Sequence, residues 1–179
     1  APQLVAEVGA GSHGTSNANG SVTGSVGDLR YSLGATTLRT KGFNSLRNPA
    51  NSAYNTDTDG FSMESANAAL TYGLAPGHEV GLSAFHSDGR NRYDGGSSVA
   101  TRVRQYENAL TVQNHSVYLK NSITPDWNST LRMGRSTDDS TNYRDAAMTD
   151  VFRTDQNQFT WQNDIRLPIG KLLLAWESL

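Results

Sequence analysis

Hydrophobic and polar side chains alternate along much of this sequence. Leu4, Ala6, Val8 and Ala10 fall on one face of an extended chain, with Glu7 on the other. A period of two is typical of a β-strand. The same alternation recurs in residues 21–26, 29–37, 65–74, 80–86, 105–123, 129–135, 159–167 and 172–176. The pattern therefore predicts an all-β, antiparallel chain of roughly nine strands.

The connections between these segments differ in length. We predict short turns at residues 27–28, 75–78, 124–127 and 168–170, and long polar loops at residues 11–20, 41–62, 87–102 and 136–150. In an up-and-down sheet every second connection emerges at the same end. We therefore expect the short turns at one end and the long loops at the other, in strict alternation. Outer-membrane β-barrels have this asymmetry, with short periplasmic turns and long extracellular loops.

Composition narrows the choice of fold. Only 36% of the residues are hydrophobic, and the sequence lacks a run of the ~20 apolar residues that a transmembrane helix needs. Strands with one apolar and one polar face fit a transmembrane β-barrel, in which the apolar side chains meet lipid. Tyr72, Trp127, Trp161 and Trp176 lie near strand ends or on apolar faces, where an aromatic girdle would place them. We expect an antiparallel up-and-down transmembrane β-barrel segment.

A soluble β-sandwich is the alternative fold, because the same alternation arises when one face of each strand packs in a core. The two folds make opposite predictions for the large apolar side chains. In a sandwich, these side chains would pack together in a dry interior, whereas in a barrel they would face acyl chains. The side chains that distinguish the two folds are Leu70, Val117, Leu131 and Phe159.

Charge and cysteine content exclude further classes of protein. The sequence contains no cysteine, so disulfides and thiolate metal sites are excluded. The formal net charge of −2 leaves no surplus of basic residues, and nucleic-acid binding needs such a surplus. Nucleic acid is therefore not an expected partner.

An oxygen-rich segment separates two of the predicted strands. Asn55, Asp57 and Asp59 alternate with threonines, and Gly60 follows them. Side-chain oxygens at alternate positions, followed by a glycine that permits a sharp turn, can converge on a hard cation such as calcium. The segment is not an EF-hand, because Ala66 stands where that motif needs a bidentate glutamate. A solvated turn without metal is the alternative.

Four short segments together resemble a known family. They are Arg39-Thr40-Lys41-Gly42-Phe43-Asn44, Thr56-Asp57-Thr58-Asp59-Gly60-Phe61, Asn91-Arg92-Tyr93-Asp94 and Ser136-Thr137-Asp138-Asp139. Their succession resembles the first part of the barrel of TonB-dependent outer-membrane receptors, in particular the cobalamin (vitamin B12) transporters. The resemblance implies that residues 1–179 form one partial barrel domain. It also implies that the plug domain and the later strands of a barrel of roughly 22 strands lie outside this sequence.

The resemblance implies a candidate site as well. In the cobalamin transporters, acidic residues of the second and third extracellular loops bind calcium and so order the loops for substrate. By motif, those positions correspond to Asp57, Asp59 and Asp94 in this sequence. Tyr93, beside them, corresponds to a position at the substrate.

This sequence departs from the family pattern at two positions. Asn44 stands where the family has an aspartate, and Ala100 falls near another acidic position. Fewer carboxylates weaken calcium binding. The candidate metal ligands are Asp57, Asp59, Asp94, Asn55 and Asn44, and the candidate substrate-binding residue is Tyr93.

The expected function is TonB-dependent uptake of cobalamin or a similar metal chelate, with calcium-ordered extracellular loops, in the bacterial outer membrane. The expected partners are outer-membrane lipid, a cobalamin-like small molecule and a periplasmic energy-coupling protein that acts through the plug. We expect no catalytic residue.

Two other functions fit parts of the sequence. A soluble β-sandwich adhesin or carbohydrate-binding module could use the same Asx-rich loop to bind calcium. An outer-membrane barrel enzyme would need a base and an acid, and His86 and Asp88 are the plausible pair. Because the histidines His13, His78, His86 and His115 are scattered and no nucleophile motif accompanies them, we do not expect an enzyme.

Overall fold

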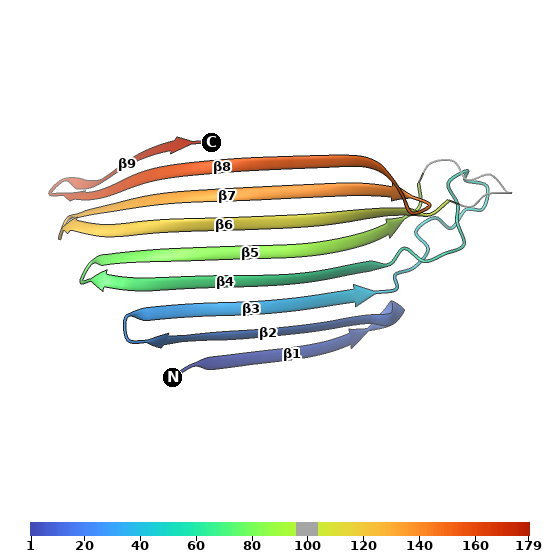
Figure 1. Ribbon diagram of the computed structural model, residues 1–179, viewed down its shortest axis with the longest axis horizontal. Helices are drawn as coiled ribbons and strands as arrows, with labels where there is room; N and C mark the ends of the chain where they lie inside the picture. Colours follow the sequence, from blue (N-terminus) through green and yellow to red (C-terminus); the bar gives the residue numbers. More distant parts are fainter. Residues whose placement is uncertain (96–103) are drawn as a thin grey trace.

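The chain forms a single antiparallel sheet (Figure 1). The computed structural model describes residues 1–95 and 104–179, and in these residues nine strands follow one another in sequence order, each hydrogen-bonded to the next. They are β1 (Gln3–Gly11), β2 (Thr15–Val26), β3 (Leu29–Thr40), β4 (Phe61–Ala75), β5 (His78–Tyr93), β6 (Tyr106–Thr124), β7 (Trp127–Arg144), β8 (Ala147–Leu167) and β9 (Gly170–Ser178). This arrangement confirms the predicted all-β, up-and-down fold.

Tight turns connect the strands at one end of the described sheet. They are formed by residues 27–28, 76–77, 125–126 and 168–169. Gly27 and Gly77 have φ angles of 56° and 82°, a conformation that glycine adopts without steric cost. The short turns predicted from the sequence are therefore confirmed.

The opposite end differs from the prediction in three places. Residues 11–20 do not form a long loop, because β1 and β2 are separated by only a short 3-10 helix, η1 (Ser12–Gly14). Residues 136–150 do not form a loop either, since β7 and β8 meet in the turn Asp145-Ala146. The predicted loop at residues 87–102 begins only after Tyr93, and its position Ala100 lies outside the described residues. The predicted strict alternation of short turns and long loops is therefore wrong.

These errors have one physical cause. Where both faces of a strand are polar, hydrophobic and polar residues do not alternate, so the segment reads as a polar loop. Strands β6, β7 and β8 have 19, 18 and 21 residues, whereas about 9–11 residues suffice to cross a bilayer. The polar halves of these strands are the segments that the alternation pattern failed to detect.

Strand register separates an apolar face from a polar face. Direct cross-strand neighbours on one face, from β3 to β8, are Tyr31, Leu70, Leu82, Val117, Met133 and Phe159. The adjacent row, on the other face, is Arg30, Thr71, Gly81, Tyr118, Arg132 and Thr160. We call the face with the first row the outer face and the other the inner face.

The apolar part of the outer face is slightly shorter than the lipid-facing band of outer-membrane barrels. Along β4 it runs from Ala66 to Leu74. At about 3.4 Å per residue and a tilt of about 40°, this length rises roughly 20 Å, close to the ~25 Å apolar band of outer-membrane barrels.

Protein does not cover the apolar side chains of the outer face. No hydrophobic side chain among the described residues is buried, and Leu70, Val117 and Leu131 are 39%, 38% and 37% exposed. Phe159 is half-buried against the ring of Trp176, at 5.4 Å between centroids. The described residues therefore lack the dry interior that a β-sandwich requires. None of their helical structure is long and apolar enough to cross a membrane.

Cross-strand contacts, rather than a core, fix the inner face. The ring of Tyr118 lies over Gly81, where a Cβ would come within 2.0 Å of a ring carbon. The guanidinium of Arg132 lies 5.6 Å from the centroid of the same ring, and the Tyr118 hydroxyl is 3.1 Å from Oγ1 of Thr71. Glycine at position 81 thus allows the tyrosine to lie flat against the sheet, a common device for bracing strands.

Candidate functional site

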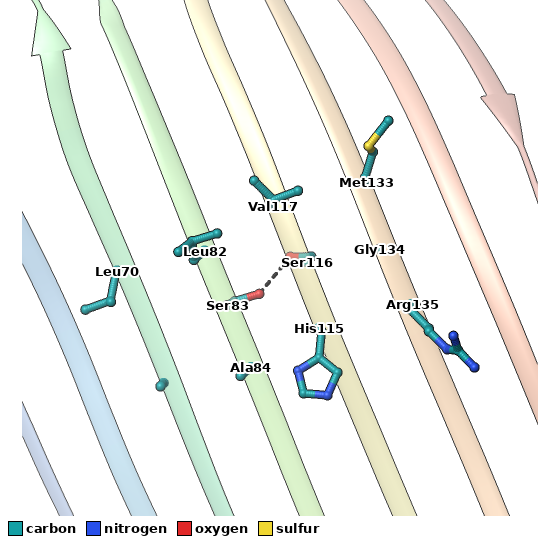
Figure 2. Close-up of a pocket in the computed structure, with 11 residues that line it drawn as sticks. Leu70, Leu82, Ser83, Ala84, His115, Ser116, Val117, Met133, Gly134 and Arg135 are labelled. Atoms are coloured by element: carbon teal, nitrogen blue, oxygen red, sulfur yellow. Dashed lines mark hydrogen bonds between the residues drawn. The ribbon is translucent and has the colours of Figure 1, made fainter.

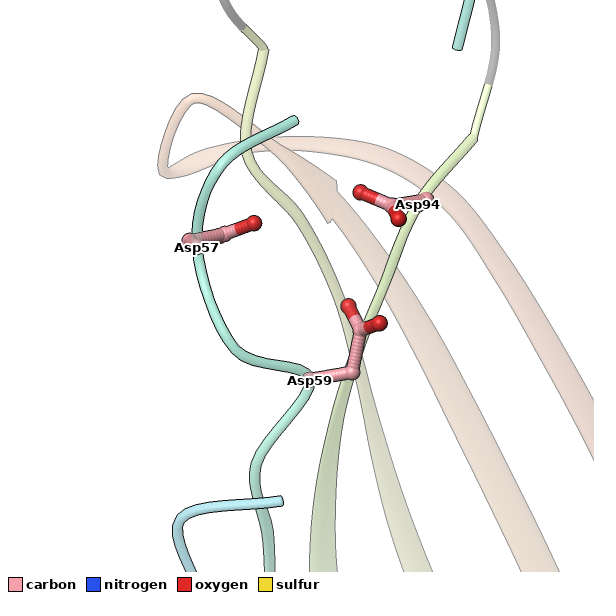
Figure 3. Close-up of side chains that lie close together, drawn as sticks. All are labelled: Asp57, Asp59 and Asp94. Atoms are coloured by element: carbon pink, nitrogen blue, oxygen red, sulfur yellow. The ribbon is translucent and has the colours of Figure 1, made fainter. Parts of the chain in front are cut away.

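Three carboxylates from two connections gather beyond the loop end of the sheet (Figure 3). Asp57 and Asp59 belong to the connection between β3 and β4, and Asp94 directly follows β5. Phe61 pairs with Asn91 where β4 and β5 meet, so the segments that lead to Asp59 and Asp94 leave the sheet side by side. One oxygen from each carboxylate lies within 4.8 Å of the other two. The structure therefore brings together the three acidic residues predicted as metal ligands.

Two consecutive residues of the β3–β4 connection hold this carboxylate cluster in place. Ser45 donates to Oδ2 of Asp59 from its backbone N–H, at 2.9 Å, and from its hydroxyl. The backbone N–H of Leu46 donates to Oδ2 of Asp94 at 3.3 Å. The segment at 45–46 therefore links the two connections through their carboxylates.

Asn44 and Asn55 join the same loops by hydrogen bonds. Oδ1 of Asn44 accepts the N–H of Leu46 at 3.0 Å, and its Nδ2 donates to the carbonyl of Asn55. Asn55 is 4% exposed, and its Nδ2 donates to the carbonyl of Arg104 at 3.4 Å. Both side chains thus hold backbone segments together. Their role as metal ligands stays a prediction.

The surroundings of Asp94 disfavour its ionised form. Burial raises the pKa of this carboxyl above its ordinary value, and the negative charge of Asp59, followed by that of Asp57, raises it further. The hydrogen bond from the Leu46 N–H acts in the opposite direction. Like charges this close repel one another, so a cation between the carboxylates would remove a destabilising interaction.

The spacing of the carboxylates suits a calcium ion. Calcium–oxygen distances are about 2.3–2.6 Å, so two ligands on opposite sides of the ion lie about 5 Å apart. Oxygens within 4.8 Å of one another satisfy this limit. Because calcium takes about 6–8 oxygens, backbone carbonyls, amide oxygens or water would complete the shell. The residues present therefore fit a hard divalent cation.

Tyr93 ends β5 next to the carboxylate cluster. It pairs in register with Tyr106 at the start of β6, and the two ring centroids are 5.7 Å apart with an interplanar angle of 36°. By strand alternation both side chains belong to the inner face, like Gly81 further along β5. Two rings at this position offer an apolar contact surface for a ligand that arrives at the loop end. Substrate binding by Tyr93 stays a prediction.

His86 and Asp88, the pair considered for an enzyme, do contact each other. Nε2 of His86 lies 2.7 Å from Oδ2 of Asp88, and Oδ1 of Asp88 accepts the hydroxyl of Thr111 at 2.6 Å. Both side chains lie on the outer face and are 47% and 59% exposed. Among the described residues, no hydroxyl forms a hydrogen bond with His86. The two side chains and Thr111 thus form an exposed, hydrogen-bonded cluster on the outer face.

The sequence analysis missed a connection between the β7–β8 turn and the site. Arg104 donates to Asp145, 41 residues away, at 3.3 Å, and the N–H of Gln105 donates to the same carboxylate at 3.0 Å. The carbonyl of Arg104 in turn accepts Asn55. Neither Arg104 nor Asp145 lies in a motif, so only the register of β6 and β7 could have indicated that they are in contact.

The described residues thus form a one-layer, up-and-down sheet with an exposed apolar band, a polar inner face and a carboxylate cluster at one end. Among solved structures, the chain is similar to P. aeruginosa FpvA, in a complex with iron and a heterologous pyoverdine, with 12% sequence identity and a TM-score of 0.58. The match covers 91% of this chain and 29% of FpvA, and at this identity it shows the fold alone. No protein-family model and no curated protein matches the chain.

Proposed function

We propose that this chain is part of a bacterial outer-membrane receptor that takes up a metal chelate by TonB-dependent transport. The observation that carries the proposal is the two-faced sheet, whose apolar rows are exposed rather than packed in a core. A soluble protein would cover such a surface, whereas lipid solvates it. The fold shared with FpvA, whose structure was determined with an iron–pyoverdine complex, supports the transport role.

The complete receptor would need parts that this chain does not contain. The chain spans 29% of the length of FpvA, so a plug and further strands would come from elsewhere in the full-length protein. The edges of β1 and β9 would pair with those strands, because unpaired backbone groups are very costly in hydrocarbon. A periplasmic energy-coupling protein would act on the plug.

Calcium would order the extracellular loops in this scheme. Asp57, Asp59 and Asp94 would hold the ion, and Asn44 and Asn55 would either contribute amide oxygens or hold the loops around it. An ion at this position would tie the β3–β4 connection to the end of β5. Tyr93 would then be fixed where substrate binds.

Cobalamin is the substrate that we favour, because the motifs around the carboxylate cluster resemble those of the cobalamin transporters. An iron chelate is the second candidate, because the structurally similar FpvA is described in a complex with iron and pyoverdine. The two candidates share a transport mechanism and differ in the ligand that the loops recognise.

The test is a titration of the full-length receptor in detergent with cyanocobalamin. It is done once with calcium present and once with a calcium chelator instead. We expect calcium to tighten cobalamin binding by about 5–150-fold, the usual range of coupling between two sites. In the double variant Asp57→Ala/Asp59→Ala this effect should disappear. Asp126→Ala is the matched control, because Asp126 lies in the turn at 125–126, at the opposite end of the sheet.

The outcomes separate the parts of the proposal. Binding of ferric pyoverdine without binding of cobalamin would contradict the substrate and leave the receptor role. Cobalamin binding that is indifferent to calcium would contradict the metal site. A protein that stays monodisperse without detergent would contradict the outer-membrane assignment.

A further inference from the structure

A shallow groove crosses the outer face over β4 to β7 (Figure 2). Its volume is about 560 Å³, and its apolar lining includes Leu70, Leu82, Val117 and Met133. Ala68 and Ala84 also line it, and their small size leaves room between the larger side chains. The groove lies within the apolar band, so on the proposed function it faces lipid.

Basic side chains border the loop-side end of the groove. His115 and Arg135 are direct neighbours on β6 and β7, one row closer to the loops than Val117 and Met133. From β5 to β8, the next outer-face row in that direction is polar, with His86, Gln113, Thr137 and Asp155 as direct neighbours. His115 and Arg135 therefore stand at the boundary between the apolar band and the water-exposed part of the strands.

Arg135 donates one hydrogen bond to its acidic neighbour and remains exposed. Asp155 accepts Arg135 at 3.3 Å, but it is held more closely by the Thr137 hydroxyl at 2.7 Å and by Nε of Arg153 at 2.9 Å. Arg153 also reaches Asp139 at 3.6 Å. The side chain of Arg135 is 59% exposed, so its remaining donors are available to an anion above the groove. No acidic side chain lines the groove among the described residues.

We propose that this groove binds an acyl chain of a phosphate-bearing membrane lipid, with the phosphate held by His115 and Arg135. The apolar lining would contact the chain along the strands, and the small residues would let it lie close to the sheet. Arginine suits phosphate because its planar guanidinium can donate two parallel hydrogen bonds. The basic pair lies toward the water and the apolar lining toward the bilayer centre, which is the order of the headgroup and the acyl chain in a membrane lipid. The inference rests on the proposed function, which places the outer face in lipid.

Native mass spectrometry of the full-length receptor in detergent tests the proposal. Dioleoyl phosphatidic acid is the probe, and dioleoylglycerol, which has the same acyl chains without the phosphate, is the comparison lipid. We expect the phosphorylated lipid to bind at least about tenfold more tightly, the effect of one charge-assisted hydrogen bond or more. The double variant His115→Gln/Arg135→Gln should remove this preference. Arg39→Gln is the control, since Arg39 is an exposed cation that does not line the groove.

A second variant tests the apolar part without a change in charge. Ala84→Trp should fill the groove and weaken binding of both lipids, while cobalamin binding reports that the receptor remains folded. Equal affinity for the two lipids, loss of the preference in Arg39→Gln, or unchanged lipid binding in Ala84→Trp would each overturn the inference. A receptor that binds cobalamin but shows no lipid preference would overturn the groove and leave the proposed function intact.

Discussion

The carboxyl of Asp94 couples cation binding to pH. Burial and the charges of Asp59 and Asp57 raise its pKa, so the folded loops bind a proton more tightly than an unfolded aspartate does, whose pKa is about 3.9. In the cation-free protein this proton stabilises the loops at low pH, and the stabilisation is lost as pH rises through the raised pKa. A calcium ion must displace the same proton. We therefore predict that calcium affinity falls when pH is lowered from about 7 to about 5.

Calorimetric titration of calcium at the two pH values measures this effect. Asp94→Asn should bind calcium more weakly at both values and should show a smaller pH dependence, because the titrating group is gone. An unchanged pH dependence in this variant would mean that another group takes up the proton.

Single residues show how far sequence reasoning reached into the site. Alternate spacing within one short segment predicts Asp57 and Asp59 as cation ligands. Asp94 is 35 residues from Asp59 in the sequence, so only the family resemblance connected the two. The N–H donors of Ser45 and Leu46 carry no side-chain signal. Their contribution depends on a loop conformation that residue types do not specify.

The turn between β7 and β8 contains a residue in an unfavourable conformation. Ala146 has a φ of 64° and follows Asp145, with a φ of 52°. Two successive positive φ angles are typical of a type I′ hairpin turn, which favours glycine at its second central position. Because a Cβ disfavours this region, we predict that Ala146→Gly stabilises the hairpin by about 0.5–1 kcal/mol.

Hydrogen exchange of the amides of β7 and β8 beyond the apolar band is the appropriate measurement. Ala109→Gly provides the control, since Ala109 lies in the interior of β6, where glycine should destabilise by about 0.5–1 kcal/mol. Slower exchange in Ala109→Gly, or faster exchange in Ala146→Gly, would contradict this explanation of the turn.

The region around this turn shows why the sequence predicts some strands and not others. Where one face of a strand is apolar, alternation is strong, and the sequence predicts β1 to within one residue at each end. Residues 136–144 lie where both faces are polar, so they lack alternation. Asp145-Ala146 also lacks the Asn-Gly or Asp-Gly signal of a tight hairpin. Without a strand pattern or a turn signal, the sequence predicts a loop at residues 136–150.

At the scale of the whole molecule, the two faces of the sheet should respond differently to the same charge. Leu70 lies at the middle of the apolar rows of β4, and Ala69 lies next to it on the inner face, opposite Ser32 and Ser83. An arginine near the centre of the lipid-facing band costs about 2–4 kcal/mol. We predict this loss of folding free energy for Leu70→Arg, and less than about 1 kcal/mol for Ala69→Arg.

Urea unfolding of the full-length receptor in lipid vesicles would give both values. The pair is matched because the substitutions are adjacent and introduce the same side chain. Equal costs at the two positions would mean that the faces have similar surroundings, which is incompatible with a membrane-spanning wall.

The unequal strand lengths give this wall a sloping rim. Strands β2 and β3 have 12 residues each, whereas β7 and β8 have 18 and 21. The β3–β4 connection, which carries Asp57 and Asp59, follows the short strand β3 but projects past the β7–β8 hairpin (Figure 1). Asp145 of the β7–β8 hairpin is hydrogen-bonded to Gln105 next to this connection, so a surface tag that leaves the loops undisturbed belongs instead at the turn 27–28, at the opposite end of the sheet.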